Sequence, residues 1–218
     1  MISHNHEQGS AEWHAARAGV ITASMFSTAR YKTKKGEWSS EAKNYAFRLA
    51  LERMGGQPLD DGMETWAMKR GKELEPAARA RHAAIIGLEV KPCGFFTTDC
   101  GTFGSSPDGL IGDNGCSEYK ALVDPSRIGK VLVSNDLSEF MDQIQGHLWI
   151  TGREWCDFCI YLPQLASVKR DMFRQRVYVQ DQGALVADLH EFNALVVKTQ
   201  AALDQQLPVQ LDRAVEPF

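Results

Sequence analysis

The chain has 218 residues, of which 24 are Lys or Arg and 28 are Asp or Glu, so its formal net charge is −4. This length fits a single domain spanning residues 1–218, large enough to bury roughly 70 % of the surface that its unfolded chain exposes. The net charge gives no indication of a nucleic-acid partner and does not exclude one, because a local basic cleft can still attract DNA. The lack of a basic tail argues against a protein that coats DNA indiscriminately.

The cysteines and the polar start of the chain indicate a reducing compartment. Five cysteines, an odd number, occur in a chain too long to need disulfides. Cys156-x-x-Cys159 could suggest an iron–sulfur cluster, but such clusters need four cysteines, so we expect buried free thiols. No apolar run approaches the roughly 18 residues of a membrane span. We therefore expect a soluble cytoplasmic protein without a membrane partner.

The first 24 residues contain a candidate phosphate pocket. Residues 1–10 are polar and predict a loose lead, and a short helix ended by glycine follows at residues 12–19. Arg17, Thr22 and Ser24 could form an anion pocket, in which a guanidinium lies beside hydroxyls and a helix N-terminus. The same pattern also fits an ordinary helix, capped by Thr22 or Ser24, with a surface arginine, and locally it favours this alternative.

A basic loop at residues 31–38 contains three lysines, one of which is Lys34. Such a loop suits contact with the DNA backbone or minor groove, but three lysines in a loop are equally often just solvated. Residues 40–54 then repeat apolar side chains at helical spacing, and two glycines end this helix. This helix is expected to be core scaffold.

Residues 64–86 have a helical pattern interrupted by Gly71 and Pro76. A proline inside a helix removes a backbone hydrogen bond and kinks the helix. It also disfavours the helical conformation of the preceding residue, here Glu75. The irregularity could aim the Glu75 carboxylate at a site, whereas the alternative is a surface glutamate on a charged helix.

Residues 89–111 alternate between apolar runs and turns, which is typical of antiparallel strands. The last of these strands begins after Asp108, and the sequence Gly112-Asp113-Asn114-Gly115 then predicts a tight hairpin turn. On the returning strand Glu118 and Lys120 project from the same side, because side chains alternate between the two faces. The hairpin can therefore bring Asp108 back towards them.

Asp108, Glu118 and Lys120 suit a metal-dependent nuclease. Two carboxylates are the hard oxygen ligands that Mg²⁺ prefers, usually with waters and a phosphate. A neighbouring ammonium can hold the water that attacks a phosphodiester. A surface hairpin with a salt bridge would contain the same residues. The order Pro-Asp, spacer, Glu-x-Lys is the pattern of the PD-(D/E)xK nuclease superfamily.

The rest of the chain predicts a polar connector at residues 125–135, helices at 137–150 and 181–206, and strands at 157–162 and 174–179. On the first of these helices Gln143 lies on a different stripe from the apolar residues, so it faces either the site or solvent. The C-terminal helix is amphipathic and could pack on the sheet or on a neighbouring subunit.

Five motifs occur in order over residues 12–162: Trp13-His14-x-x-Arg17-x-Gly19-Val20-Ile21-Thr22-Ala23-Ser24, Gly71-Lys72-x-x-Glu75, Ser106-Pro107-Asp108-Gly109-Leu110, Glu118-Tyr119-Lys120 and Met141-x-Gln143-Ile144-Gln145. Together they resemble the lambda-exonuclease-like, YqaJ-type viral recombinase family of the PD-(D/E)xK superfamily. The resemblance implies an α/β (α+β) fold with a restriction-endonuclease-like core, in which a central mixed β-sheet is flanked by α-helices.

The resemblance also implies roles for the candidate residues. Asp108 and Glu118 would bind two Mg²⁺ ions in the family pattern of two-metal nucleases, with Mn²⁺ as a substitute. The backbone carbonyl of Tyr119 would assist them, and Glu75 would support the second metal. Lys120 and Gln143 would place the attacking water. Arg17, Ser24 and Ser106 correspond to the family's 5′-phosphate pocket, which the local pattern extends to Thr22.

Three further residues fall near DNA-contacting positions of the family. Lys34 lies near a groove-contacting basic residue, although the loop length differs. Trp66 and Met68 lie near an apolar wedge that splits the DNA end. The C-terminal third resembles the family only loosely.

The resemblance implies a processive, Mg²⁺-dependent 5′→3′ exonuclease on double-stranded DNA. It would degrade the 5′-phosphorylated strand to mononucleotides and leave a 3′ overhang for single-strand-annealing recombination. A homotrimeric ring, an annealing-protein partner, and a phage or prophage origin in the bacterial cytoplasm are implied too. The alternatives are another PD-(D/E)xK nuclease, of endonuclease or RecB-like specificity, and a non-catalytic module that binds DNA ends.

Overall fold

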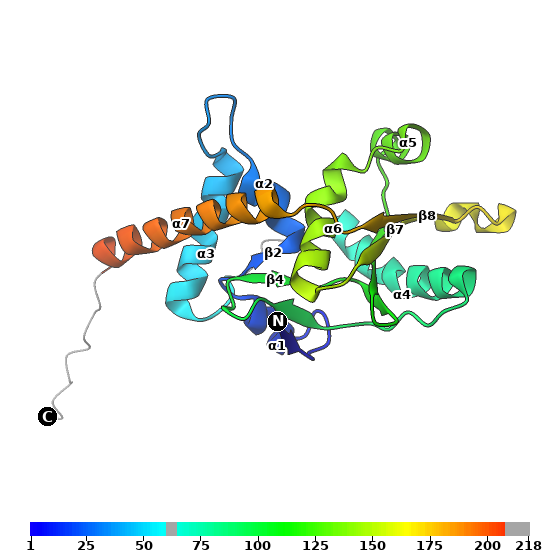
Figure 1. Ribbon diagram of the computed structural model, residues 1–218, viewed down its shortest axis with the longest axis horizontal. Helices are drawn as coiled ribbons and strands as arrows, with labels where there is room; N and C mark the ends of the chain where they lie inside the picture. Colours follow the sequence, from blue (N-terminus) through cyan, green and yellow to red (C-terminus); the bar gives the residue numbers. More distant parts are fainter. Residues whose placement is uncertain (60–64, 208–218) are drawn as a thin grey trace, which may run out of the picture.

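Two mixed four-stranded sheets bordered by helices form the fold (Figure 1). The computed structural model describes residues 1–59 and 65–207. The predicted class, a mixed α/β fold with helices flanking the sheet, is confirmed. The strands are divided between two sheets, where the sequence predicted one central sheet.

The first sheet has the strand order β1(Ile2–His4), β3(Phe95–Thr97), β4(Phe103–Ser105) and β2(Ile21–Thr22). β2 runs parallel to β4, and the other neighbours are antiparallel. The expected loose lead over residues 1–10 is thus wrong for its first residues, because β1 pairs with β3, some ninety residues away along the chain. The residues of this segment show no alternation of apolar and polar side chains that would predict a strand.

The second sheet contains the predicted hairpin. Its order is β5(Gly109–Ile111), β6(Gly115–Lys120), β7(Trp155–Tyr161) and β8(Met172–Tyr178). β5 and β6 are antiparallel and joined by the predicted turn, in which Gly112 has a φ of +53°. β6 and β7 are parallel, and β7 and β8 are antiparallel. β7 and β8 match the predicted strands at 157–162 and 174–179 to within two residues.

The helical elements are α1(Ala11–Arg17), η1(Ala23–Met25), α2(Phe26–Arg30), α3(Ser40–Gly55), α4(Trp66–Ile86), α5(Pro125–Ser134), α6(Ser138–Thr151), η2(Pro163–Val168) and α7(Gly183–Gln206). The five predicted helices are all found, although residue 64, the predicted start of α4, lies outside the described residues. α4 stays helical through Gly71 and Pro76, so Glu75 lies on a regular helical surface and not at a break.

The predicted polar connector at residues 125–135 is wrong, because this segment is helix α5. The Asp124 carboxylate accepts a hydrogen bond from the backbone N–H of Ser126 and caps the helix, and Pro125 takes its first position. Val131 is buried against α6 and β7 side chains. The Asp-Pro pair is a helix start signal that outweighs the polar composition of the segment.

The helices border the second sheet on its two faces. Cys116, Phe158 and Ile160 face α6, where they form a core with Phe140 and Ile144. Side chains one residue along the strands point the other way, so Tyr119 and Cys159 pack against Ala78 of α4. α6 also contacts β3 and β4 of the first sheet, and α2, α3 and α7 pack together beside it (Figure 1). α6 therefore bridges the two sheets.

The contact between α6 and α2 depends on a glycine. A Cβ added at Gly146 would lie 2.6 Å from Cε2 of the fully buried Phe26 and 3.0 Å from Cβ of Ala23. We expect Gly146→Ala to lower the free energy of unfolding by about 1–3 kcal/mol, because a close-packed core has no room for the methyl group. Urea unfolding measures this change.

Gly129 supplies the matched control. It lies inside α5, and a Cβ added there meets nothing within 4 Å. Gly129→Ala should leave stability unchanged or raise it by up to about 1 kcal/mol, since alanine favours a helix over glycine. Equal stabilities for the Gly129→Ala and Gly146→Ala variants would contradict the close approach of α6 to α2.

The five cysteines are free, and Cys156 and Cys159 are buried in β7, as expected of inert thiols. Over residues 1–59 and 65–207, none of the helices is both long and apolar enough to span a membrane.

Candidate functional site

The β5–β6 hairpin brings Asp108 next to Glu118 and Lys120. Asp108 precedes β5, where its backbone N–H donates to the carbonyl of Ser117 at 3.0 Å. Its Oδ2 accepts a hydrogen bond from the backbone N–H of Tyr119 at 2.6 Å. The Asp108 carboxylate is therefore fixed against the peptide that joins Glu118 to Tyr119.

Glu118 is the centre of a hydrogen-bonded cluster, and only 2 % of its surface is exposed. Its Oε1 accepts from Lys120 Nζ at 2.6 Å and from Gln143 Nε2 at 2.7 Å. Lys120 Nζ also donates to Gln143 Oε1 at 3.0 Å. On the other side, His147 Nε2 lies 2.9 Å from Glu118 Oε2. The structure thus brings Glu118, Lys120 and Gln143 together and adds a histidine.

The two carboxylates of the cluster differ in how well the protein stabilises their charged forms. Burial raises the pKa of Glu118, but the Lys120 ammonium and the hydrogen bond from His147 outweigh burial and hold this pKa at about 2. Burial, followed by the charges of Glu118 and Glu75, raises the pKa of Asp108 well above its ordinary value. A group of carboxylates that repel one another in a buried place is stabilised by a bound cation.

Glu75 approaches from α4 and is joined to Asp108 through an arginine. Arg79 forms an ion pair with Glu75 and donates from Nε to the backbone carbonyl of Asp108 at 3.0 Å. Burial raises the pKa of Glu75, and Glu118 adds to this effect while Arg79 opposes it. The predicted neighbourhood of Glu75, Asp108 and Glu118 is therefore present, although Pro76 does not break the helix.

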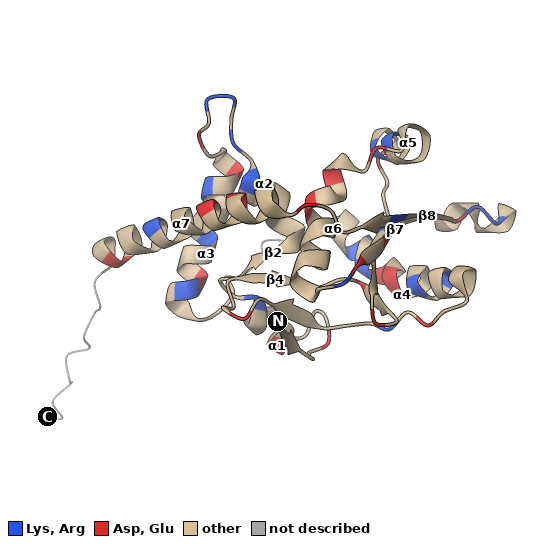
Figure 2. Cartoon of the chain, in the orientation of Figure 1, with Lys and Arg blue, Asp and Glu red and all other residues tan. Residues whose placement is uncertain are grey.

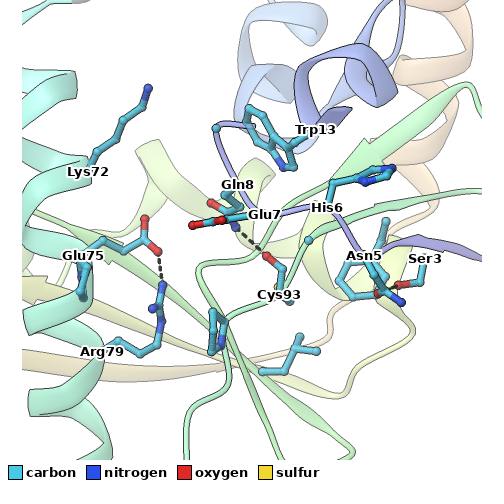
Figure 3. A pocket seen from close by; sticks show the side chains of 16 residues that line it. Ser3, Asn5, His6, Glu7, Gln8, Trp13, Lys72, Glu75, Arg79 and Cys93 are labelled. Carbon is cyan, nitrogen blue, oxygen red and sulfur yellow. Dashed lines mark hydrogen bonds and ion pairs between the residues drawn. The ribbon is translucent and has the colours of Figure 1, made fainter. Parts of the chain in front are cut away.

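A cavity of about 900 Å³ opens beside this cluster. Figure 3 shows Lys72, Glu75 and Arg79 of α4 on one side of it and Gln8 and Trp13 on the other. Gln8 Nε2 donates to the carbonyl of Pro107 at 3.0 Å, which ties the N-terminal segment to the residue before Asp108. The cavity gives a solute access to the Glu75–Arg79 side of the cluster.

The donor set fits a hard divalent cation. Mg²⁺ is commonly bound by one or two carboxylates, with waters and substrate oxygens filling the other positions. Asp108 and Glu118 are two such carboxylates, and the charge repulsion between them is the feature that a cation would relieve. Among the described residues no three His, Cys, Asp or Glu side chains are grouped as a metal site. Asp108 and Glu118 remain the predicted ligands of such an ion, with the Tyr119 carbonyl and Glu75 as the other predicted contributors.

Arg17 and Ser106 meet at Trp13. The Arg17 guanidinium lies 4.1 Å from the centre of the Trp13 ring and 5.2 Å from that of Phe95. Trp13 Nε1 donates to Ser106 Oγ at 3.1 Å. Ser106 lies two residues before Asp108, in the segment between β4 and β5, so the arginine is held beside the segment that leads into the carboxylate cluster.

Thr22 and Ser24 lie on the adjacent strand and turn. Thr22 pairs with Gly104 in the parallel register of β2 and β4, and its backbone N–H donates to Tyr45 Oη at 3.1 Å. Its hydroxyl is 3.4 Å from that of the exposed Ser24 and makes no helix cap, so the predicted capping role of these two side chains is wrong. Burial raises the pKa of Tyr45, and the Arg17 charge opposes this shift. Arg17 is therefore close to the Tyr45–Thr22 contact.

Ser105 and His147 connect the first sheet, which contains Thr22, to the Glu118 cluster. Ser105 Oγ lies 2.6 Å from His147 Nδ1, and the other nitrogen of this ring contacts Glu118. Since a carboxylate only accepts, Nε2 donates to Glu118, and Nδ1 accepts from Ser105 in the tautomer that leaves Nδ1 without a proton. The sequence predicted no site role for Ser105, Arg79 or His147. His147 does lie four residues from Gln143 on the same stripe of the helix, and this spacing was the available signal for it.

The predicted DNA-contacting residues lie outside these contacts. Lys34 is exposed in the loop between α2 and α3, where Figure 2 shows a concentration of Lys and Arg. Trp66 and Met68 begin α4 and are 68 % and 56 % exposed. The Arg70 guanidinium is 6.0 Å from the Trp66 ring. Their proposed contacts with DNA therefore rest on exposure and position.

Comparison with known proteins gives two kinds of match. Residues 12–154 match the family model of the YqaJ-like viral recombinase domain. A crystal structure of an alkaline exonuclease, LHK-Exo, from Laribacter hongkongensis is 31 % identical, with 90 % of this chain and 97 % of that chain covered at a TM-score of 0.77. The complex of LHK-Exo with dAMP is 32 % identical, with the same coverage and TM-score.

A more distant structure shares the fold. A phage-related exonuclease from Haemophilus somnus 129PT is 13 % identical, with 86 % of this chain and 96 % of that chain covered at a TM-score of 0.65. No curated protein sequence matches significantly.

Proposed function

Because the chain belongs to the YqaJ-like viral recombinase domain family, we propose that it is a metal-dependent DNA exonuclease whose cutting centre is formed by Asp108, Glu118 and Lys120. The observation that carries the proposal is the convergence of Lys120 Nζ and the Gln143 amide on one oxygen of Glu118, next to Asp108. The similar alkaline exonuclease supports the reaction class.

The side chains of the site would divide between binding the metal ion and orienting the attacking water. Bound Mg²⁺ supplies Lewis-acid stabilisation of the charge that develops on the phosphate. Asp108 and Glu118 hold that ion, assisted by the Tyr119 carbonyl and Glu75, and His147 keeps the Glu118 carboxylate oriented. Lys120 Nζ and Gln143, which already contact one another, orient the attacking water for displacement of the leaving oxygen.

We further propose that Arg17, Thr22, Ser24 and Ser106 form an anion site for the 5′-terminal phosphate, and that digestion of duplex DNA therefore proceeds 5′→3′ from a phosphorylated end. The guanidinium is positioned by Trp13 and the hydroxyl of Ser106 by the same indole. An arginine beside hydroxyls suits a terminal phosphate. The 5′-phosphorylated strand would be released as mononucleotides and leave a 3′ overhang.

Arg17→Ala tests this polarity. Loss of a charge-assisted phosphate contact of about 1.5–3 kcal/mol should slow digestion of 5′-phosphorylated ends roughly 10–100-fold. Ends with a 5′-hydroxyl lack the phosphate and should slow much less. Single-turnover rates on otherwise identical duplexes measure the difference, and equal slowing of both substrates would contradict the pocket.

Dependence on DNA ends separates the proposal from its alternatives. Linear duplex and covalently closed circular duplex are incubated with Mg²⁺ or with a chelator. Loss of the linear substrate alone, and only with Mg²⁺, is expected. Cleavage of the circle would indicate an endonuclease of the same superfamily, and failure to degrade either substrate would indicate a non-catalytic DNA-end-binding module.

Assembly and partnership belong to the proposal as well. A homotrimeric ring would enclose the product strand and make digestion processive, and a phage-type single-strand-annealing protein would receive the 3′ overhang. Both are expectations based on the family resemblance, and sedimentation as a monomer at working concentration would contradict the ring.

A further inference from the structure

Helix α4 presents three side chains to the hairpin that carries the carboxylates. Glu75, Arg79 and His82 are spaced by four and three residues, so they share one face of the helix. Arg79 binds the carbonyl of Asp108, as described above. His82, which has no role in the proposed mechanism so far, reaches Tyr119 on β6.

His82 is completely buried and is bonded at both ring nitrogens. Its Nδ1 is 2.9 Å from Tyr119 Oη, and its Nε2 is 3.2 Å from Asp157 Oδ2. Asp157, on β7, also accepts hydrogen bonds from Arg174 and Arg176 of β8. Because the carboxylate only accepts, Nε2 carries a proton, and in the neutral ring Nδ1 accepts from the Tyr119 hydroxyl.

Tyr119 is the residue between Glu118 and Lys120, and its side chain points to the opposite face of the sheet from theirs. Its backbone N–H donates to Asp108 Oδ2 at 2.6 Å. A phenol held by His82 therefore fixes the rotation of the strand at this residue. That rotation sets the direction of the N–H that orients Asp108 and of the two neighbouring side chains.

We propose that His82 is a positioning residue for the divalent cation, which acts through the Tyr119 hydroxyl to hold the main chain of β6 in the orientation that Asp108 and Glu118 need to bind metal. This inference rests on the proposed function of the site. It assigns to α4 a task beyond packing, because one helix face contacts both halves of the ligand-bearing hairpin. Removal of a residue that orients a metal ligand without touching the metal typically weakens metal affinity about 10–100-fold.

The two nitrogens of His82 can be replaced one at a time. The side-chain polar atoms of asparagine lie at the distance of Nδ1 from the backbone, whereas glutamine places its amide nitrogen at the distance of Nε2. His82→Asn should therefore keep a partner for Tyr119 and lose the contact with Asp157. His82→Gln should keep the contact with Asp157 and lose that with Tyr119. Tyr119→Phe removes the hydroxyl alone and leaves His82 in place.

Mn²⁺ binding to the DNA-free protein, measured by titration calorimetry, tests the proposal without any turnover. We expect His82→Gln and Tyr119→Phe each to weaken Mn²⁺ binding about tenfold, and His82→Asn to change it less than about twofold. The double variant His82→Gln/Tyr119→Phe should be no weaker than either single variant, since both remove one contact. Melting temperatures of the metal-free proteins report the purely structural effect.

Two results would overturn the positioning role. One is Mn²⁺ binding by Tyr119→Phe that equals wild type, which decides the matter even if a His82 variant does not fold. The other is equal weakening by His82→Asn and His82→Gln, which would make His82 a packing residue. Failure of the wild-type protein to bind Mn²⁺ would instead overturn the proposed function itself.

Discussion

Asp108→Asn is expected to abolish metal-dependent digestion of duplex DNA while leaving the fold intact. The asparagine can still accept the hydrogen bond from the Tyr119 N–H through its side-chain oxygen, but it removes one of the two carboxylates proposed to hold the cation. Stabilisation by the metal is worth several kcal/mol, and about 4 kcal/mol corresponds to a loss of roughly a thousandfold in rate. Single-turnover digestion of a 5′-phosphorylated duplex measures the loss.

The same substitution should not lower the melting temperature of the metal-free protein. Burial and the charges of Glu118 and Glu75 raise the pKa of Asp108, so its charged form is less favourable in the folded protein than in the unfolded chain. A neutral side chain removes that cost. Asp113→Asn makes the same change in the exposed turn of the hairpin and should leave digestion at the wild-type rate. Near-wild-type digestion by Asp108→Asn would contradict the assignment.

Lys120→Met is expected to lower the rate of cleavage without weakening metal binding. The methionine keeps an apolar stem but lacks the ammonium that contacts Glu118 and Gln143. Positioned groups that handle the nucleophile and its proton typically contribute about 10²–10⁴-fold, so a loss of that size is expected. Because the ammonium also neutralises Glu118, its removal should leave Mn²⁺ binding as tight as in the wild type or tighter.

Lys130→Met is the control for Lys120→Met, since Lys130 lies exposed on α5. It should match the wild type in both rate and Mn²⁺ affinity. Loss of Mn²⁺ binding together with activity in Lys120→Met would show that the lysine builds the metal site, and the proposed division of labour between carboxylates and lysine would then be wrong.

The central part of this site follows from local sequence rules. A Gly-rich turn between two short strands and the alternation of side chains placed Asp108, Glu118 and Lys120 together, and the hairpin has this arrangement. Gln143 could be assigned to a stripe of its helix but not to the site or to solvent. The parallel pairing of β6 with β7, packed under α6, brings Gln143 to Glu118.

The parts that the sequence did not reveal depend on long-range pairing. β1 forms because its backbone pairs with β3, and no period in its three residues announces it. Ser105 and His147 meet across the junction of the two sheets. His82 lies on α4, and its partners Tyr119 and Asp157 come from two strands, β6 and β7. A single sequence carries no direct record of such contacts.

The wrong prediction for α5 has a different cause, because the local sequence signal for a helix start was present. Asp124 followed by Pro125 is a cap and a favourable first helical residue, and Val131 supplies an apolar side chain at the buried face. The expectation of a connector rests on the overall polarity of the segment and not on these start signals. The polar face of α5 is exposed to solvent. A polar composition is therefore compatible with a surface helix.

Release of the 5′-terminal nucleotide is the most direct test of the proposed mechanism. A linear duplex carrying a 5′-phosphate and a label on its first nucleotide is incubated with the wild-type protein, with Mg²⁺ or with a chelator. We expect labelled mononucleotide to appear first, before label from the interior of the strand, and only with Mg²⁺. Release of the 3′-terminal nucleotide first, of internal fragments, or of any product without a divalent metal would contradict it.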